Sequence, residues 1–396
     1  MEPISYKHVW TAIIAGGQGT RLFPLSHDKC PKQFCQLDGS NTFIQATVKR
    51  FVAAGVKASR IVVITTNANQ TFLANEQLTP LGVLSQNIVQ IVPYYDYAGA
   101  MIYAGRFINK YDEDAIIINT PADQYIVADD NFADTIKLAI SSAQNGTPAI
   151  VGVKIHDLVT FMGCGHAMYD PNDQAFCREV IGFVEKPDRE LADKLMREEK
   201  SACNTGINVW SAKELITATE DVDLEKEKVG TSDLMGMFTN LALAVGEFKW
   251  FDCGTLKSFY DISKKTPNHR NASFGDVTRY KCMNSLFMAP EGVEIDANFV
   301  ENAAVIANII EGVPVLAIVK LEDSQRVRQL AEDYQKNKDF LTDDFSVGAR
   351  NNRVVRTNFS DEVRLGFVGV RNYDVVPMKL RDDRIKFVVT YEGTNR

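Results

Sequence analysis

A glycine-rich loop followed by two cations is the feature of this sequence whose residue types could do chemistry. Gly16, Gly17 and Gly19 directly follow an apolar run, and Arg21 and Lys32 come soon after them. Because glycine has no Cβ, such a loop lets backbone N–H groups approach a phosphate closely. A guanidinium binds phosphate oxygens as a bidentate fork, and an ammonium binds them as a point charge. The spacing therefore predicts a polyphosphate site.

Two commoner phosphate-binding motifs do not fit this loop. Leu22 stands where the dinucleotide-binding fingerprint requires a third glycine, and no Gly-Lys-Ser/Thr follows at the spacing of a Walker loop. For the glycines alone, a plain tight turn is the alternative interpretation. The surrounding sequence is longer and more specific than a turn requires, reading Gly-Gly-x-Gly-Thr-Arg-Leu-x-Pro-Leu-Ser at 16–26 and Pro-Lys-Gln-Phe at 31–34.

Short apolar runs rich in β-branched residues alternate with helical patterns over the first 150 residues, and these elements must position the loop. This alternation predicts an α/β fold with a doubly wound, mixed or parallel sheet. In such sheets ligands bind beyond the carboxyl ends of the strands, so the loops after Ala15 and Asn119 form the candidate site. The predicted strands are Val9–Ala15, Arg60–Thr65, Ile88–Val92, Ala115–Asn119 and Ala149–Val153, and the predicted helices are Thr42–Ala54, Asn69–Leu78, Tyr97–Asn109 and Phe132–Ala143.

The composition is that of an ordinary globular chain and excludes several classes of protein. The 396 residues carry a formal net charge of −8, which argues against broad nucleic-acid binding because that requires clustered cations. No stretch approaches about 18 consecutive apolar residues, and the first residues lack a signal-peptide pattern, so we expect a cytoplasmic protein without a membrane partner. The 7 cysteines are scattered and form no Cys-x-x-Cys, so we expect reduced, partly buried thiols rather than disulfides or a zinc site.

The glycine loop together with Pro-Lys-Gln-Phe resembles the signature of the sugar-1-phosphate nucleotidylyltransferases, and of the mannose-1-phosphate guanylyltransferase branch in particular. The resemblance extends over residues 8–335 and implies a Rossmann-like, GT-A-like nucleotidyltransferase fold. Further motifs follow in the order typical of that family, at Pro121-Ala122-Asp123, Phe183-Val184-Glu185-Lys186-Pro187, Asn204-Thr205-Gly206-Ile207 and Asp252-Cys253-Gly254-Thr255.

The resemblance implies transfer of a nucleotidyl group from a nucleoside triphosphate to a sugar 1-phosphate, with release of pyrophosphate. The expected substrates are GTP and mannose 1-phosphate, the expected product is GDP-mannose, and the expected cofactor is Mg²⁺. Because the sugar phosphate attacks the α-phosphorus in line, catalysis rests on positioning and charge neutralisation rather than on a covalent nucleophile.

The resemblance also assigns roles to individual residues. Arg21 and Lys32 are expected to neutralise the triphosphate, and Asp123 and Asp252 to hold Mg²⁺. Nucleotide binding is assigned to Ala15, Gly16, Gly17, Gly19, Thr20, Arg21, Lys32, Pro93 and Asp123, and sugar-phosphate binding to Gly163, Glu185, Lys186 and Asn204. Taken singly, an Asp after a strand is also typical of a helix cap, and a Glu-Lys-Pro tripeptide of a solvated charge pair.

Three segments depart from the family pattern and leave the specificity open. Asp96-Tyr97-Ala98-Gly99-Ala100, after Tyr94-Tyr95, replaces an Asn-Thr-Ala-Pro-Ala that borders the base; Gln124 replaces a His; and Met162-Gly163-Cys164 replaces a Tyr-Gly-Tyr stretch. UTP or dTTP and other sugar 1-phosphates therefore stay as alternatives. A catalytically silent regulatory relative that binds a nucleotide sugar is a further alternative, although the glycines, cations and aspartates are all present. We expect His166 to be structural.

Three domains are expected, at 1–265 (catalytic), 266–345 (β/α) and 346–396 (a small β-rich basic module). The second contains a predicted strand at Val313–Val319 and a predicted helix at Ser324–Phe340. The third has ten Lys/Arg against six Asp/Glu in Arg350–Arg396, and we expect it to serve assembly into a homodimer or higher homo-oligomer. Because no solenoid repeat is visible, we expect neither the β-helix nor the cupin-type isomerase domain of related enzymes.

Overall fold

The structure, a computed structural model, describes residues 4–17, 19–36, 41–92, 95–173, 175–226, 228–336, 353–356, 362–370 and 372–391. The chain divides into two compact units. Unit 1 comprises Met1–Gly16 and Phe43–Phe251, and unit 2 comprises Gly17–Thr42 and Asp252–Arg396.

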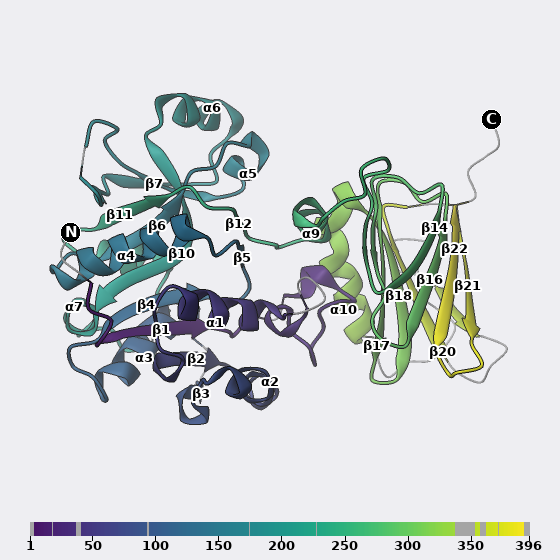
Figure 1. Cartoon of the computed structure of the whole chain (residues 1–396), viewed down its shortest axis with the longest axis horizontal. Helices are drawn as coiled ribbons and strands as arrows, with labels where there is room; N and C mark the ends of the chain where they lie inside the picture. The colour runs from purple at the N-terminus through teal and green to yellow at the C-terminus, as the bar shows by residue number, and fades with distance from the viewer. Residues whose placement is uncertain are drawn as a thin grey trace. The chain divides into compact units, whose positions relative to one another are not determined.

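Unit 1 is built on a mostly parallel sheet with the strand order β3-β2-β1-β4-β10-β6-β11-β8 (Figure 1). Strand β1 (Val9–Ile14) lies between β2 (Ile61–Thr65) and β4 (Ile116–Pro121) and is parallel to both. Strand β10 (Ser201–Ser211) runs antiparallel between β4 and β6 (Ala149–Val153). The predicted α/β class is confirmed. The remaining strands of unit 1 are β3 (Ile88–Gln90), β5 (Tyr125–Ile126), β7 (Gly165–Met168), β8 (Arg178–Glu179), β9 (Gly182–Glu185), β11 (Ala242–Gly246) and β12 (Trp250–Phe251).

Helices α3 (Tyr97–Asn109) and α4 (Asp130–Gln144) cover opposite faces of this sheet. The core beneath α3 includes Ala12 of β1 and Trp210 of β10, both fully buried. Side chains alternate along a strand, so the equally buried Ile13 points to the other face, where α4 packs on β4, β6 and β10. This burial on both faces explains why the strands read as continuous apolar runs in the sequence.

The helices predicted for unit 1 are confirmed to within two residues at each end. Their starts follow capping chemistry: the Asp96 carboxylate accepts from Gly99 N at the start of α3, and Asp129 accepts from Phe132 N at the start of α4. The other helices of unit 1 are α1 (Phe43–Ala53), α2 (Ala68–Leu78), α5 (Leu158–Met162), α6 (Arg189–Glu198), α7 (Ala212–Ala218) and α8 (Thr231–Gly236).

Unit 2 contains two sheets, ordered β13-β15-β17-β18-β20-β19 and β14-β16-β22-β21 (Figure 1). The first stacks β13, β15 and β17 in parallel, and the second stacks β14, β16 and β22 in parallel. Phe287, Ile295 and Phe387, all fully buried, belong to the one core that the two sheets share. The strands are β13 (Ala272–Phe274), β14 (Asp276–Tyr280), β15 (Leu286–Met288), β16 (Val293–Asn298), β17 (Ala303–Ile310), β18 (Val313–Lys320), β19 (Arg353–Arg356), β20 (Glu362–Val368), β21 (Tyr373–Lys379) and β22 (Ile385–Tyr391).

Two expectations for the C-terminal region are wrong. Parallel strands stack here in the manner of a β-helix, although no repeat was visible in the sequence. The tail is not a separate module, because β20 pairs in parallel with β18 and β22 pairs in parallel with β16. These pairings join residues far apart in the chain, so no local periodicity in the sequence predicts them.

The predicted strand at Val313–Val319 and the predicted helix that follows it are both present. The strand is β18, and the helix begins as a short 3₁₀ turn at Leu321–Arg326 and continues as α10 (Val327–Lys336). Residues 337–340 of the predicted helix lie outside the described residues.

The segment Gly17–Thr42 belongs to unit 2, which differs from the predicted domain boundary at residue 265. The Phe23 ring lies 5.1 Å from the Tyr334 ring of α10. Asn308 Nδ2 of β17 donates a 2.7 Å hydrogen bond to the Pro24 carbonyl. The segment that carries the glycine-loop cations is therefore held by C-terminal elements.

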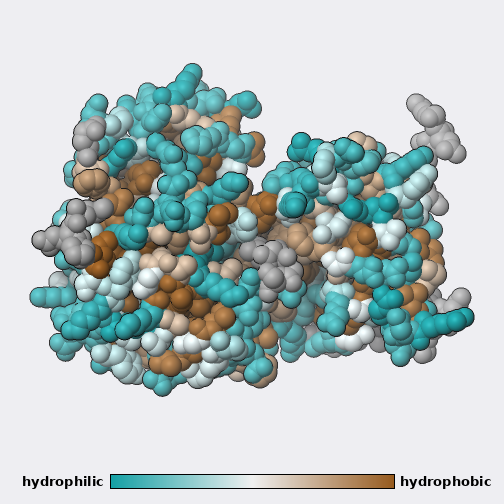
Figure 2. Space-filling model, viewed as in Figure 1, coloured by the Kyte–Doolittle hydropathy of each residue, from teal (hydrophilic) through white to brown (hydrophobic). Residues whose placement is uncertain are grey.

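On the visible surface, hydrophilic residues are interspersed with smaller groups of hydrophobic residues in each unit (Figure 2). Such a mixture is ordinary for a folded chain. Among the described residues, none of the helices has the length and apolar character needed to cross a membrane.

Replacing Phe132 tests the core beneath α4. Phe132 is 1% exposed, and its ring lies 5.8 Å from Phe51 and 5.3 Å from Phe248. Phe132→Ala is expected to lower the free energy of unfolding by about 3–5 kcal/mol, because it leaves a cavity. Urea unfolding followed by tryptophan fluorescence measures this, since all 3 tryptophans lie in unit 1.

Phe72→Ala is the matched control for this substitution. Phe72 is also in unit 1 but is 61% exposed, so Phe72→Ala is expected to lower the free energy of unfolding by about 0.5 kcal/mol or less. Equal effects of the two substitutions would contradict the core packing described here.

Candidate functional site

The glycine loop begins where β1 ends. Ala15 N donates to Ile64 O at 2.8 Å, which continues the pairing with β2. The Gly16 carbonyl accepts hydrogen bonds from Thr66 Oγ1 at 3.4 Å and from Gln70 Nε2 at 3.3 Å. A Cβ at Gly16 would lie 2.6 Å from Thr66 Cγ2, so only glycine fits this approach to the turn between β2 and α2.

Asp123 leaves the sheet at the same edge as Gly16. The register of β1 and β4 pairs Ile14 with Pro121, and Ala122 N donates to Ile14 O at 3.2 Å. Because parallel neighbours end together, the turn that carries Asp123 lies beside the start of the glycine loop. The two loops selected from the sequence therefore lie at the same carboxyl edge in unit 1, and their role as a site remains a prediction.

A bulge in β10 presents Asn204 at this edge. The pairing of β10 with β6 shifts register between Asn204 and Asn208. Within the bulge, Asn204 Oδ1 accepts from Gly206 N at 2.9 Å, and Gly206 adopts φ +76°, a left-handed conformation. Bulges redirect a side chain locally, and this one fixes the orientation of the Asn204 amide.

Two side chains that depart from the family pattern hold the bulge. The Tyr97 hydroxyl, at the start of α3, donates to Gly206 O at 2.9 Å, and Gln124 Nε2 donates to Thr205 O at 2.6 Å. Burial raises the pKa of Tyr97 well above its usual value, and the nearby Asp123 carboxylate raises it further. Tyr97 is thus a neutral hydrogen-bond donor beside Asp123 at any pH near neutrality.

Glu185 and Lys186 lie at the end of β9, in exposed positions. Lys186 Nζ is 3.5 Å from Glu185 Oε1, and both side chains are more than half exposed. The backbone of Lys186 is left-handed, with φ +43°, and its N–H donates to Cys164 O at 3.0 Å. This bond brings the pair next to Gly163, which ends helix α5. Lys186, Glu185 and Gly163 are therefore neighbours, as the sugar-phosphate assignment requires.

His166 is a structural residue, as expected. It is 1% exposed, its Nε2 lies 2.8 Å from Phe161 O, and its ring stacks on Phe161 at 3.8 Å. Burial lowers the pKa of the imidazole.

In unit 2, the two parts of the signature pack directly on one another. Gly19 has φ +63° and begins the short turn Thr20–Leu22, and a Cβ at this position would lie 2.2 Å from Lys32 Cβ. Gln33 Nε2 also donates to Gly17 O at 3.0 Å. The glycine loop and Pro-Lys-Gln-Phe therefore form one folded segment.

Arg21, Lys32 and Asp252 converge within unit 2. Lys32 is 3% exposed, and its Nζ donates to the Asp252 carbonyl at 2.8 Å. A Cβ at Gly254 would lie 2.8 Å from Asp252 Oδ2 and 3.7 Å from Arg21 Nη1, so both side chains face this glycine. Two cations and one carboxylate thus gather around residues 252–254.

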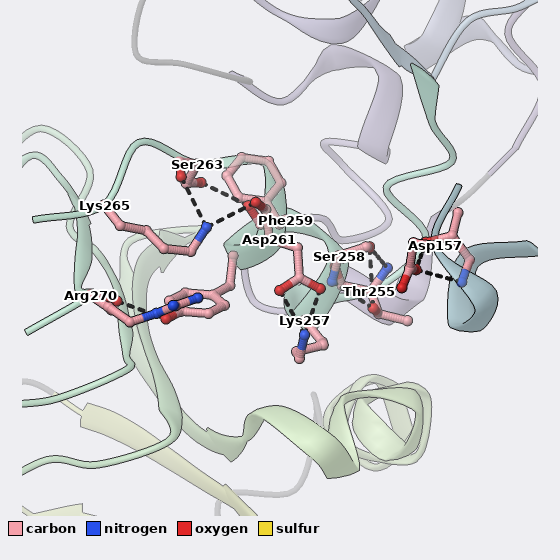
Figure 3. A network of polar contacts seen from close by, with 11 residues as sticks. Asp157, Thr255, Lys257, Ser258, Phe259, Asp261, Ser263, Lys265 and Arg270 are labelled. Atoms are coloured by element: carbon pink, nitrogen blue, oxygen red, sulfur yellow. Dashed lines mark hydrogen bonds and ion pairs between the residues drawn. The ribbon is translucent and has the colours of Figure 1, made fainter. Parts of the chain in front are cut away.

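Helix α9 (Leu256–Ile262) anchors this segment just after Gly254 (Figure 3). Thr255 and Ser258 form a reciprocal cap, in which Ser258 N donates to Thr255 Oγ1 at 3.1 Å and Thr255 N donates to Ser258 Oγ at 2.9 Å. One turn on, Lys257 Nζ lies 2.6 Å from the Asp261 carboxylate. The capped helix therefore fixes the direction of the chain immediately after Asp252 and Gly254.

The predicted site residues divide between the two units, and their assigned roles remain predictions. Pro93 lies outside the described residues. Within the part of the chain that the structure describes, no group of three or more His, Cys, Asp or Glu side chains is placed so that it could hold a metal ion. Unit 1 contains Ala15, Gly16, Asp123, Gly163, Glu185, Lys186 and Asn204, and unit 2 contains Gly17, Gly19, Thr20, Arg21, Lys32 and Asp252.

Sequence reasoning missed four contacts that shape the site. Thr66 holds the Gly16 carbonyl, Gln33 holds Gly17, Tyr97 holds Gly206, and Gly254 lets Arg21 and Asp252 approach. The motifs contained Gln33 and Gly254, so both could have been singled out. Thr66 belongs to no motif, and nothing in the sequence marks it.

Replacing glycines of the loop tests how tightly it is packed. Gly19→Ala would force a left-handed alanine and a clash with Lys32 Cβ, at a cost of about 1–2 kcal/mol from the backbone alone. We expect tryptic cleavage after the buried Lys32 to accelerate by about tenfold or more, because cleavage follows the population of the opened segment. Timed digestion with mass spectrometry measures this rate.

Gly17→Ala is the matched control in the same loop. A Cβ at Gly17 meets nothing within 4 Å, and its φ is not left-handed. Cleavage after Lys32 is expected to stay at the wild-type rate. Equal acceleration in both variants would mean that the contact between Gly19 and Lys32 does not hold the segment.

Comparison with known proteins shows where this chain belongs. The profile of the Nucleotidyl transferase family matches residues 11–269. The mannose-1-phosphate guanylyltransferase of Sinorhizobium fredii is 27% identical over 357 residues, which are 82% of this chain and 65% of that protein. Mannose-1-phosphate guanylyltransferase 2 of Escherichia coli is 27% identical over 360 residues, which are 81% of this chain and 72% of that protein.

One solved structure shares the fold over most of the chain. The crystal structure of mannose-1-phosphate geranyltransferase from Thermus thermophilus has a TM-score of 0.70 and 22% identity, covering 83% of this chain and 99% of that one. Nucleotidyltransferases of the matched family generally use a divalent metal. The resemblance read from the motifs is confirmed, and this chain belongs to the Nucleotidyl transferase family.

Proposed function

We propose that this chain transfers a guanylyl group from GTP to mannose 1-phosphate and releases GDP-mannose and pyrophosphate. Three lines of argument support the proposal. The family match establishes the class of chemistry, and the names of the relatives point to GTP and mannose 1-phosphate. The convergence of Arg21, Lys32 and Asp252 around Gly254 is the observation that carries it, because it supplies cations where a leaving polyphosphate needs them.

Arg21 and Lys32 have complementary roles in this proposal. Arg21 is exposed, and its guanidinium is free to turn toward phosphate oxygens as a fork. Lys32 is buried with its ammonium held at the Asp252 carbonyl, so its charge is fixed in place before substrate arrives. A preorganised charge stabilises a developing negative charge without reorganisation, which favours release of pyrophosphate.

Asp123 and Asp252 are the proposed ligands of Mg²⁺, as the resemblance to the family implies. A hard cation of this kind is bound through one or two carboxylates together with substrate phosphates, and that is the donor set these residues offer. When bound, Mg²⁺ supplies positive charge to the phosphates.

Asn204, Glu185 and Lys186 are proposed to bind the sugar phosphate. Since Asn204 Oδ1 is occupied by Gly206 N, the amide presents its NH₂ group as donor to a sugar hydroxyl. Lys186 is exposed, with its backbone held at Cys164, and is proposed to pair with the sugar phosphate. Glu185 is proposed to accept hydrogen bonds from sugar hydroxyls.

The alternative substrates follow from the departures around Asp123. Tyr97 and Gln124 both hold the β10 bulge, so the backbone beside Asn204 is held by side chains that differ from the family pattern. UTP or dTTP with another sugar 1-phosphate would use the same chemistry. Only a direct measurement of turnover separates these substrate pairs.

A substrate panel tests the proposal. The protein with Mg²⁺ is given each of GTP, ATP, UTP and dTTP with mannose, glucose or galactose 1-phosphate, and pyrophosphate release is followed. We expect the highest kcat/KM for GTP with mannose 1-phosphate, by about tenfold or more over other pairs. A higher kcat/KM for a different substrate pair would overturn the proposed specificity for GTP and mannose 1-phosphate but would support nucleotidyl transfer as the reaction. No release from any pair, with GDP-mannose binding intact by calorimetry, would instead indicate a silent relative.

Asp123→Asn tests the metal assignment. The change keeps the shape and removes the charge, so we expect kcat to fall on the order of 10²-fold or more while the unfolding curve stays unchanged. Asp114→Asn is the control, because Asp114 is exposed and precedes the opposite end of β4. Turnover retained in Asp123→Asn would refute the assignment.

A further inference from the structure

Two cysteines flank Lys32 within the signature segment, and the proposed function does not use them. The Sγ atoms of Cys30 and Cys35 lie 3.7 Å apart. Residues 31–34, which include Lys32, separate the two cysteines in the sequence. All seven cysteines of the chain are among the described residues, and none of them forms a disulfide.

The two thiols differ in a way that suits a nucleophile and its resolving partner. Cys30 is partly exposed, whereas Cys35 is 4% exposed. The hydrogen bond from Cys35 lowers the pKa of Cys30 against the opposing effect of burial. The same contact, with burial, raises the pKa of Cys35 well above its usual value. The accessible sulfur is therefore the one favoured as thiolate, which is the reactive form.

The backbone on both sides of this pair is fixed. His27 and Cys30 exchange two backbone hydrogen bonds of 3.0 Å. The Cys35 thiol lies 3.2 Å from Leu25 O, and Cys35 N donates to Lys32 O at 3.0 Å. The two sulfurs thus face each other from a short, well-anchored turn.

We propose that Cys30 and Cys35 form a peroxide-reactive dithiol, whose closure to a disulfide displaces Lys32 and slows nucleotidyl transfer. The effect on turnover rests on the proposed function, whereas disulfide formation does not. The Cys30 thiolate attacks one oxygen of hydrogen peroxide, the O–O bond breaks, and hydroxide leaves and is protonated to water. Cys35 then attacks the resulting sulfenic sulfur; the S–O bond breaks, the S–S bond forms, and a second water leaves with the proton of Cys35.

The packing around Lys32 explains why closure affects it. A disulfide requires the sulfurs to approach from 3.7 Å to about 2.05 Å. Lys32 lies inside the ring that this bond closes, and its Cβ already sits against Gly19. Its ammonium donates a hydrogen bond to the Asp252 carbonyl at 2.8 Å. Contraction of the turn therefore shifts the Lys32 side chain relative to Gly19 and Asp252.

The experiment treats the reduced full-length chain with hydrogen peroxide, removes the excess with catalase, and alkylates the remaining thiols. Peptide mass spectrometry is expected to find Cys30 linked to Cys35 in the same chain. The kcat/KM for the nucleoside triphosphate is expected to fall on the order of tenfold, since small misplacements of a charge that stabilises the leaving pyrophosphate cost that much or more, and to recover with dithiothreitol.

Three variants separate the steps. Cys35→Ser is expected to stop at a Cys30 sulfenic acid, which dimedone traps, and Cys30→Ser is expected to be insensitive to peroxide. Cys177→Ser is the control, because Cys177 is the other partly exposed cysteine and burial raises its pKa to about 11. It should behave as wild type.

The outcomes are distinct. Neither a linked peptide nor a dimedone adduct at Cys30 would overturn the modification site. A linked peptide with unchanged kcat/KM would overturn the effect on Lys32. If the reduced chain shows no turnover with any substrate pair, the proposed function fails. Peptide mass spectrometry still decides whether the disulfide forms, and the rate of tryptic cleavage after Lys32 still decides whether the disulfide moves this segment.

Discussion

The close contact between Gly19 and Lys32 is the constraint on which the cationic part of the site depends. Gly19 is left-handed, and any side chain there would overlap Lys32. That contact seats the lysine in the interior, where its ammonium meets the Asp252 carbonyl. A buried charge needs such a partner, because desolvation without one is costly. The glycine loop therefore fixes the position of a cation.

The parallel sheet imposes a second, independent order on unit 1. Because β1 and β4 run in parallel and in register, Gly16 and Asp123 emerge at one edge. Antiparallel β10 brings Asn204 to that edge from the opposite direction, and its bulge is held by Tyr97 and Gln124. The side chains that depart from the family pattern are thus the ones that hold the backbone of the β10 bulge beside Asn204.

The C-terminal strands are part of what holds the signature segment. Phe23 packs against Tyr334, and Asn308 binds the Pro24 carbonyl, both within unit 2. The basic tail that was expected to be a separate module instead pairs with these sheets through β20 and β22. Changes in the C-terminal third can therefore reach Arg21 and Lys32 without passing through the parallel sheet of unit 1.

The sequence by itself determined the strands and helices of the first 150 residues and the family, and it supplied the prediction of which residues carry the chemistry. Local periods and short motifs carry that information, as Gly16 to Arg21 and Pro121 to Asp123 illustrate. Only the tertiary structure decided which parts pack together: that Gly19 meets Lys32, that Cys30 faces Cys35, and that β20 joins β18. Such contacts depend on distances between residues far apart in the chain, or on a local turn geometry, and neither leaves a periodic trace in the sequence.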